Sequence, residues 1–332
     1  MAYTTIDNPE LYFQTKLYTG TGSAASITLD GDTDMQPDMV WFKKRSSTES
    51  HYLYDAVRGV TKEIYPNSTA TESTDANSLT GFDSDGFSIG NANALSESSE
   101  TMTAWCWKES ATSGFDIVSY TGNGSARTIS HSLSAVPNFM WIKCRNVAHG
   151  AMNYHSANTS APETDSLSIT FQSATADNNT HWNDTAPTSS VFTVGTADDV
   201  NQDTKTFIAY LWSGKQGYSK FGTYEGNSNA EGPFIFLGFR PAWLMVKPID
   251  ADDNWVQFDN KRLGFNSSVS PYSLYANQDY AETSDTGQVE FLSNGFKIRN
   301  SGNTVNRSST FVYMAFAEAP FVNSNGVPCN AV

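Results

Sequence analysis

The sequence contains few charged residues, and few basic residues above all. Only 17% of its 332 residues are charged, and 20 Lys and Arg stand against 35 Asp and Glu, a formal net charge of −15. A partner with a phosphate backbone requires a basic face, so this balance argues against nucleic acid. Long amphipathic helices, which need Lys, Glu, Arg and Ala, are disfavoured for the same reason.

Cysteine is scarce and long apolar runs are missing. Cys106 and Cys144 lie in apolar stretches and Cys329 lies near the end, a spacing that forms neither a disulfide framework nor a zinc-ligand pattern. We expect buried free thiols. No apolar run approaches membrane-spanning length, and the first residues lack the basic start and apolar core of a signal peptide. We therefore expect no membrane insertion, and synthesis in the cytoplasm without an export signal.

What the sequence does contain suits packed β-structure. Apolar residues make up 39% and aromatic residues 13% of the chain, enough for well-packed cores and too much for a disordered protein. Ser, Thr, Asn and Gly are abundant between the apolar stretches. This composition favours short strands joined by many turns.

One nine-residue pattern, Pro137 to Arg145, occurs in related form at two other places, Pro37 to Arg45 and Pro241 to Pro248. The prolines are 137 − 37 = 100 and 241 − 137 = 104 residues apart, which indicates a repeat. Further landmarks recur in the same order: a glycine turn at 18–22, 120–124 and 224–227, a Phe-containing strand at 84–89, 190–194 and 293–298, and a closing aromatic strand at 103–107, 208–212 and 314–316.

We therefore predict an all-β protein of three tandem antiparallel β-sandwich units, jelly-roll or lectin-like, of about a hundred residues each. The predicted boundaries are an N-terminal arm over 1–10, unit one over 11–113, unit two over 114–216, unit three over 217–320 and a flexible C-terminal tail over 321–332. The joins are short, so neighbouring units are expected to pack closely. The strand in each proline pattern is apolar almost throughout, as in a strand covered on both faces.

The most distinctive polar repeat is an aspartate followed three residues later by an arginine. Asp55 and Arg58 form it in unit one and Asp259 and Arg262 in unit three, whereas unit two has His155 at this place and loses both charges. Such a pair is able to bind a ligand. More often it joins a strand end to a neighbouring loop through a bidentate hydrogen bond. The sequence leaves both interpretations open.

Two further sets of residues are candidates for ligand binding. Trp182 and Trp255 have polar neighbours, and an exposed indole beside Asn and Asp suits stacking on a sugar ring. Asp30, Asp32 and Asp34 have the alternate spacing with which calcium collects carboxylates, but the distal bidentate Glu is missing, which favours a plain acidic hairpin loop. No other cofactor is expected. The tryptophans on predicted strands are assigned to the core: Trp41, Trp105, Trp107, Trp141 and Trp212.

Known catalytic motifs are missing from the sequence. The five histidines share no spacing with each other or with the cysteines, and there is no nucleophile elbow, phosphate loop or metalloprotease helix. We therefore do not expect an enzyme. Glycoside hydrolysis depends on two carboxylates paired in space, which a sequence does not test, so it stays the minority hypothesis.

Four motifs in unit one resemble a domain that is repeated in proteins of tailed bacteriophages, particularly marine ones. They are Pro-Asp-Met-Val-Trp-Phe-Lys-Lys-Arg-Ser at 37–46, Tyr-Asp-Ala-Val-Arg-Gly at 54–59, Phe-Asp-Ser-Asp-Gly-Phe-Ser-Ile-Gly at 82–90 and Ala-Trp-Cys-Trp-Lys at 104–108. They look like the concanavalin-A-like jelly-roll domains of tail-fibre and virion-surface proteins. The resemblance covers residues 11–320 and is weakest in unit two, which lacks the Asp/Arg pair and the Asp-Gly before Phe192.

This resemblance implies a structural protein of the virion, forming a tail fibre, a knob or a capsid decoration that takes part in host attachment. The implied partners are other capsid or tail proteins and a host cell-surface glycan. We expect a homo-oligomer, with a trimer favoured, because several copies add weak contacts by avidity. The alternative function is that of a carbohydrate-binding adhesin or a glycan-degrading depolymerase.

Overall fold

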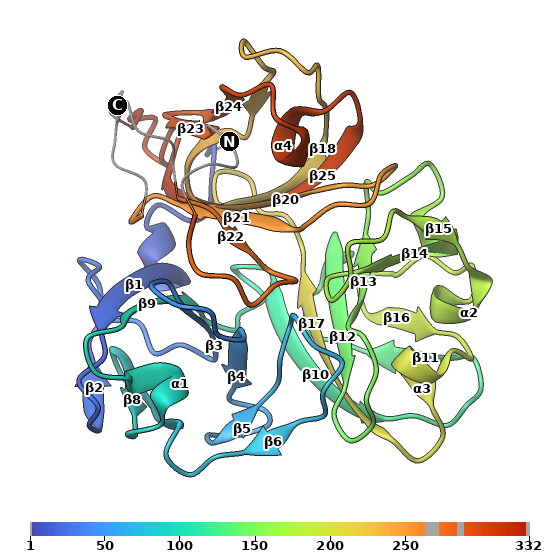
Figure 1. Cartoon of the computed structure of the whole chain (residues 1–332). Helices are drawn as coiled ribbons and strands as arrows, with labels where there is room; N and C mark the ends of the chain where they lie inside the picture. Colours follow the sequence, from blue (N-terminus) through green and yellow to red (C-terminus); the bar gives the residue numbers. More distant parts are fainter. Residues whose placement is uncertain (1, 263–271, 284–288, 330–332) are drawn as a thin grey trace.

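A computed structural model describes residues 2–262, 272–283 and 289–329 of the chain (Figure 1). All strand pairs in these ranges are antiparallel, and each helix is a single turn, so the all-β prediction is confirmed. Unit one contains η1 (Pro9–Leu11), β1 (Phe13–Thr19), β2 (Ala25–Ile27), β3 (Met39–Lys44), β4 (Tyr52–Asp55), β5 (Lys62–Glu63), β6 (Ser73–Thr74), β7 (Leu79–Asp83), β8 (Gly86–Ile89), α1 (Asn93–Ser96) and β9 (Thr101–Trp107).

Units two and three have corresponding elements. Unit two contains β10 (Phe115–Thr121), β11 (Arg127–Ser130), β12 (Phe139–Cys144), β13 (Met152–His155), η2 (Pro162–Thr164), β14 (Asp165–Ser168), β15 (Ala176–Asp177), α2 (Asn179–Trp182), β16 (Val191–Val194), α3 (Asp198–Asn201) and β17 (Thr206–Trp212). Unit three contains β18 (Ser219–Glu225), β19 (Phe234–Phe236), β20 (Phe239–Pro248), β21 (Val256–Asp259), β22 (Leu274–Tyr275), β23 (Val289–Leu292), β24 (Gly295–Ile298), α4 (Asn303–Asn306) and β25 (Thr310–Pro320).

One strand order occurs three times. In each larger sheet the first strand of the unit pairs with its last strand, which pairs with the strand of the proline pattern, giving β1-β9-β3-β4, β10-β17-β12-β13-β14-β15 and β18-β25-β20-β21-β22. A smaller sheet accompanies each one: β2-β8-β7, β11-β16 and β19-β24-β23. The short strands β5 and β6 pair with each other. This recurrence agrees with the repeat in the sequence, while the boundaries between units stay predictions.

The central strands are covered on both faces, as predicted, and all six residues of β3 are buried. Along β3 the side chains alternate: Val40 and Phe42 belong to a core within unit one, whereas Met39 and Trp41 belong to a core that all three units share. Units two and three each have a core of their own as well. In Figure 1 the three larger sheets lie around the middle of the molecule, to which they all contribute residues of the shared core.

This arrangement corrects one expectation. We expected the aromatic strands to build three separate sandwiches, but their inner faces meet in the middle of the molecule. The tryptophans assigned to the core are indeed buried, and one cluster contains all five of them together with two more: Trp41, Trp105, Trp107, Trp141 and Trp212, with Trp243 and Trp255. A unit that lacked its neighbours would expose this apolar face to water.

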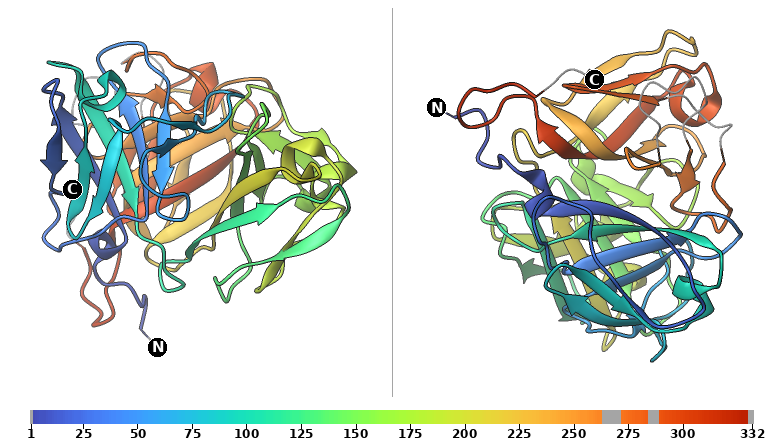
Figure 2. Two further views of the ribbon diagram at one scale, coloured as in Figure 1. Left: turned by 90° about the horizontal axis from the view of Figure 1, so that it is seen from below. Right: turned by 90° about the vertical axis from the view of Figure 1, so that its left-hand side faces the viewer.

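Both chain ends lie against unit three. In the N-terminal arm Thr4 and Ile6 are buried, and the Tyr3 hydroxyl donates to Gly238 O at 2.9 Å. The predicted flexible tail is in fact folded as far as Cys329, because Ser324 N donates to Asp7 Oδ1 at 2.6 Å. Figure 2 shows the first and last segments side by side. Hydrogen bonds to neighbouring segments hold both ends.

Candidate functional site

The two Asp/Arg pairs have the same local geometry. Asp55 ends β4, and its carboxylate accepts from Arg58 N at 2.8 Å and from Arg58 Nε at 2.5 Å. Asp259 ends β21 and accepts from Arg262 N at 2.9 Å and Nε at 2.6 Å. All four side chains are fully buried. The three-residue spacing thus closes a turn after the strand, with the guanidinium folded back on the carboxylate.

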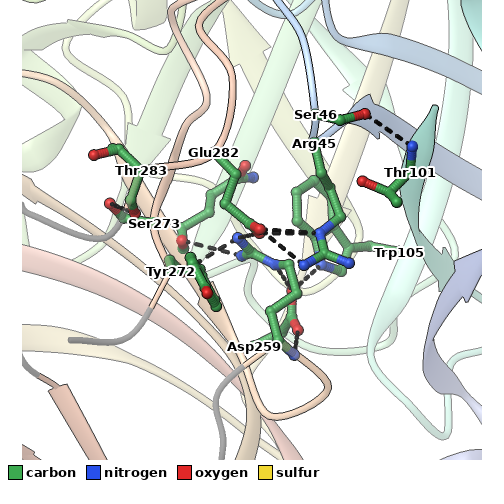
Figure 3. Close-up of polar contacts among 11 residues, drawn as sticks. Arg45, Ser46, Thr101, Trp105, Asp259, Tyr272, Ser273, Glu282 and Thr283 are labelled. Atoms are coloured by element: carbon green, nitrogen blue, oxygen red, sulfur yellow. Dashed lines mark hydrogen bonds and ion pairs between the residues drawn. The ribbon is translucent and has the colours of Figure 1, made fainter. Parts of the chain in front are cut away.

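The pair of unit three connects this unit to unit one (Figure 3). The indole Nε1 of Trp105 donates to Asp259 Oδ2 at 2.9 Å. On the other side of the pair, Glu282 accepts from Arg262 Nη1 at 2.9 Å and from Arg45 Nη2 at 2.8 Å. The network therefore runs without a break from the last strand of unit one through unit three to Arg45, which directly follows the central strand of unit one.

The pair of unit one connects it to unit two in the same way. The Tyr210 hydroxyl donates to Asp55 Oδ2 at 2.6 Å. Glu72 accepts from Arg58 Nη1 at 3.2 Å and from Arg145 Nε at 2.8 Å. Trp105 and Tyr210 occupy equivalent places, because they pair with Trp41 and Trp141 of the central strands.

At the position of the Asp/Arg pair, unit two reaches unit three through an uncharged side chain. His155 pairs with Phe139, as Asp55 pairs with Met39, so it takes the place of the aspartate. Its Nδ1 accepts from Ala157 N at 3.1 Å, which leaves Nε2–H to donate to Tyr313 O at 3.0 Å. Burial lowers the pKa of His155 to about 4, so the ring is neutral at pH 7. The three junctions thus use the same position at the end of a strand and differ in the side chain that occupies it.

The charges at these junctions stabilise each other. Burial alone would lower the pKa of Arg58, but Tyr210, Asp55 and Glu72 raise it above its ordinary value. Burial would raise the pKa of Glu72, yet its hydrogen bonds and charge interactions with Arg145 and Arg58 hold it below the usual range. A buried ion pair is destabilising to break, because one charge is left without compensation. Since neither pair has a face open to solvent, the structure supports the structural interpretation over ligand binding.

The tryptophan prediction is wrong. Trp182 and Trp255 are each only 1% exposed, so neither indole is able to stack on a sugar. Asn178 caps α2 by accepting from Thr180 N at 2.8 Å, and this single turn directs Trp182 into the core of unit two. Trp255 donates from Nε1 to Ser168 O at 2.9 Å, across the junction between units two and three. The polar neighbours in the sequence belong to caps and turns.

The acidic loop is used for local bonds. Asp30 forms an ion pair with Lys16, and Asp32 N donates to Glu10 Oε2 at 2.9 Å. Asp32 and Asp34 are exposed. Within the described ranges no group of three or more His, Cys, Asp and Glu side chains is arranged to hold a metal ion. The hairpin-loop interpretation accounts for the contacts that Asp30 and Asp32 make.

Sequence analysis missed three buried lysines, one on each central strand. Lys43, Lys143 and Lys247 are 0% exposed, and burial lowers the pKa of each to about 8. Their amines donate to backbone carbonyls: Lys43 to Lys44 at 2.7 Å and Lys247 to Pro248 at 2.6 Å. Lys143 reaches Thr69 of unit one at 3.2 Å. The signal was visible, because the lysine recurs at one place in the proline pattern.

A pair of carboxylates at the join of units one and two was also missed. Glu109 Oε1 and Asp116 Oδ1 accept from the same Ile117 N, at 3.2 Å and 3.0 Å. Burial and the hydrogen bond with Asp116 raise the pKa of Glu109 to about 7. The spacing of seven residues follows from the turn between β9 and β10, which the sequence alone does not predict. Because the pKa of Glu109 lies near neutral pH, this join is sensitive to pH.

Comparison with known proteins adds a family but no activity. Along the described part of the chain, the helices are all too short to cross a membrane. No curated protein matches the sequence. Residues 8–320, which include all three units, match a single family model. The chain therefore belongs to the family described as a domain of unknown function (DUF7483).

Proposed function

We propose that this protein is a structural component of a bacteriophage virion, forming a surface appendage that takes part in host attachment. The observation that carries the proposal is the use of the repeated polar residues. The two Asp/Arg pairs join the units around one shared core, and all four side chains take part: Asp55, Arg58, Asp259 and Arg262. Such a body is rigid, as suits a particle component, and the resemblance of its motifs to virion-surface domains supplies the setting.

Attachment needs an outward surface, and unit three offers one. Phe234 and Phe236 of β19 are 45% and 50% exposed. Ile27 in unit one and Ile129 in unit two each pair with a phenylalanine of the neighbouring strand, as does the residue that follows Phe234 in unit three. The residues directly before these two isoleucines, Ser26 and Thr128, are therefore equivalent to Phe234. An exposed aromatic pair in one unit alone is typical of a contact surface.

Labelling of intact particles tests the proposal. Antibodies raised against the purified chain are applied to particles of the phage that encodes it and viewed by electron microscopy. We expect labels at discrete places on the tail or over the capsid, and reduced adsorption of particles when the host is first incubated with the purified chain. If purified particles carry no label and lack the chain in mass spectra, the protein is not a virion component.

A carbohydrate-binding adhesin is the second candidate, and the aromatic pair favours it. Lys220 Nζ lies 5.6 Å from the centre of the Phe236 ring, and Lys297 is the cross-strand partner of Phe234. Rings beside hydrogen-bonding cations suit a sugar face. Binding to a glycan array that is lost in Phe234→Ser/Phe236→Ser would support this function. Release of reducing sugar would be needed to assign a depolymerase.

A further inference from the structure

Four carboxamide side chains meet where unit two contacts unit three. The side-chain oxygen Oδ1 of Asn254 accepts from Gln172 Nε2 at 2.8 Å, from Asn277 Nδ2 at 2.9 Å and from Gln278 Nε2 at 3.1 Å. We call these four residues the amide cluster. An amide oxygen has only two lone pairs, so the three donors compete for it, and one of them is free to turn to a ligand.

The other two junctions allow a direct comparison, because one hydrogen bond identifies corresponding residues in the three units. It runs from His51 N to Asn67 Oδ1, from Ala151 N to Thr170 Oγ1 and from Trp255 N to Asn277 Oδ1. Counted from these residues, Asn254 corresponds to Ser50 and Gly150, Gln278 to Ser68 and Phe171, and Gln172 to Thr69 and Asp279. Neither of the other junctions has more than one carboxamide among these positions.

This difference separates the amide cluster from the groups that hold the units together. Units two and three share a backbone bond from Thr175 N to Ile249 O at 2.7 Å, and the other two junctions have its equivalent. Those junctions form without an amide cluster, so the cluster is not required for assembly. A polar group that occurs in one of three repeats, on loops that a rigid scaffold positions, is typical of a binding site.

The amide cluster reaches the surface beside exposed aromatic residues. Phe171 directly precedes Gln172 and is 44% exposed, and Tyr280 lies two residues after Gln278 and is 54% exposed. Gln172 itself is exposed, while Asn254 and Gln278 are half-buried. Uncharged donors and acceptors and aromatic rings therefore occur together on the same two loops.

Both aromatic rings are held in place from below. The Phe171 ring covers Gly150, where an added Cβ would lie 2.5 Å from it. Tyr280 packs edge-on against Tyr275, with ring centroids 6.4 Å apart. Rings that are already ordered lose little freedom when a ligand packs on them.

The charges near the amide cluster select the class of ligand. The exposed charged residues that adjoin it in the chain, Asp252 and Asp279, are both acidic, and Asp253 is paired with Arg307. An anion would therefore be repelled. In the described part of the chain, no group of three or more His, Cys, Asp and Glu side chains is arranged to hold a metal ion. An uncharged ligand with both donors and acceptors meets neither obstacle.

We infer that the amide cluster binds neighbouring hydroxyl groups of an uncharged oligosaccharide. A hydroxyl both donates and accepts, so adjacent hydroxyls are able to bond to the side-chain amides of Gln172 and Gln278. The C–H faces of the sugar rings pack on Phe171 and Tyr280. The inference rests on the carbohydrate-binding candidate above, and it assigns to that candidate a surface other than β19.

Saturation-transfer NMR on the full chain tests the inference. The probes are maltotriose and N,N′-diacetylchitobiose, which are uncharged, trigalacturonic acid, which is anionic, and acetylglycylglycine amide, an uncharged peptide. We expect transfer to at least one uncharged oligosaccharide and none to trigalacturonic acid.

Two variants locate the binding. Gln172→Met/Gln278→Met keeps the length of both side chains and removes their amides, so it should weaken binding about tenfold or more, the effect of two hydrogen bonds. The matched control is Ser68→Ala/Thr69→Val, at the corresponding positions of unit one, and it should leave binding unchanged. Melting curves show whether each variant is folded.

Four results would overturn the inference. They are no transfer to either uncharged oligosaccharide, equal or stronger transfer to trigalacturonic acid, binding of the peptide in place of the oligosaccharides, and oligosaccharide binding that Gln172→Met/Gln278→Met leaves intact. If such binding is lost in Phe234→Ser/Phe236→Ser instead, the sugar binds at β19 and the adhesin candidate survives without this site. The virion role is tested by antibody labelling and so fails separately.

Discussion

At the scale of single residues, a hydrogen bond to a charged group at a junction and a neutral hydrogen bond within one unit differ in strength, and this difference is measurable. Tyr210 donates to the carboxylate of Asp55 at 2.6 Å, while Tyr224 donates to the carbonyl of Val305 at 2.8 Å. We expect Tyr210→Phe to lower the free energy of unfolding by about 1.5–3 kcal/mol and Tyr224→Phe by about 1 kcal/mol, because bonds to charged groups are stronger. Urea unfolding measures both, and equal losses would contradict the role given to Asp55.

The raised pKa of Glu109 gives a second prediction. The folded protein holds the pKa of Glu109 near 7, above its ordinary value of 4.5, so the folded state binds the proton more tightly. Its contribution to stability is therefore complete below pH 4.5 and is lost as the pH rises through about 7. Glu109→Gln keeps a neutral group at all pH values. We expect the free energy of unfolding of the wild type, relative to this variant, to fall between pH 5 and pH 8.

The control for this prediction is a carboxylate outside the pair. Glu225→Gln removes an exposed carboxylate that accepts a hydrogen bond from the hydroxyl of Thr310 at 2.8 Å. It should leave the slope of stability against pH as in the wild type. If Glu109→Gln and Glu225→Gln give the same slope between pH 5 and pH 8, the pKa of Glu109 is not raised in the folded protein.

At the scale of elements, each central strand carries one buried lysine. Lys247 illustrates how such a lysine makes the stability of the protein depend on pH. The folded pKa of Lys247 is about 8, below its ordinary value of 10.5, because burial disfavours the charged form. The associated stability is present above pH 10.5 and is lost as the pH falls through 8. The wild type should therefore gain stability relative to Lys247→Met between pH 7 and pH 10.

Denaturant unfolding at both pH values measures this difference. Lys62→Met is the matched control, since Lys62 is partly exposed and donates to Thr74 Oγ1 at 2.7 Å on the surface. The stability gained by the wild type relative to Lys247→Met should exceed that gained relative to Lys62→Met. If it does not, water reaches the end of the strand that carries Lys247. The same comparison at Lys43 and Lys143 tests whether the three strand ends are equivalent.

Elements also show what could be predicted from the sequence. The continuous apolar run of β3 predicted cover on both faces, and the proline pattern, recurring at spacings of 100 and 104 residues, predicted the repeat. The sequence does not predict what covers the second face. No feature of the sequence around Trp41 indicates whether this side chain packs in the core of its own unit or in a core shared with the neighbouring units. The prediction that Trp182 and Trp255 are exposed was wrong for a related reason: in the sequence, the capping and turn residues beside them resemble an exposed loop.

At the scale of the molecule, the junctions form a closed cycle. Unit one binds unit two through Asp55, unit two binds unit three through His155, and unit three binds unit one through Asp259. One backbone bond recurs at all three places, from Glu72 N to Arg145 O, from Thr175 N to Ile249 O and from Glu282 N to Arg45 O. The covalent joins between units are therefore not what holds the units together.

A circular permutant tests this cycle. Its new ends lie between Ala111 and Thr112, in an exposed turn, and a short Gly/Ser linker joins the native ends, which meet at Asp7 and Ser324. We expect a folded monomer with a free energy of unfolding within about 2 kcal/mol of the wild type, because exposed turns tolerate new ends.

The matched truncation, residues 1–216, keeps the original join between units one and two but removes unit three. It exposes the inner faces of two units, including Trp105, whose indole loses Asp259. We expect it to aggregate or to lack a cooperative transition, since the shared core is then incomplete. Size exclusion and urea unfolding decide between the two behaviours. A monomeric, cooperatively folding 1–216 would mean that each unit is stable by itself, and the shared core would then be a contact between finished domains.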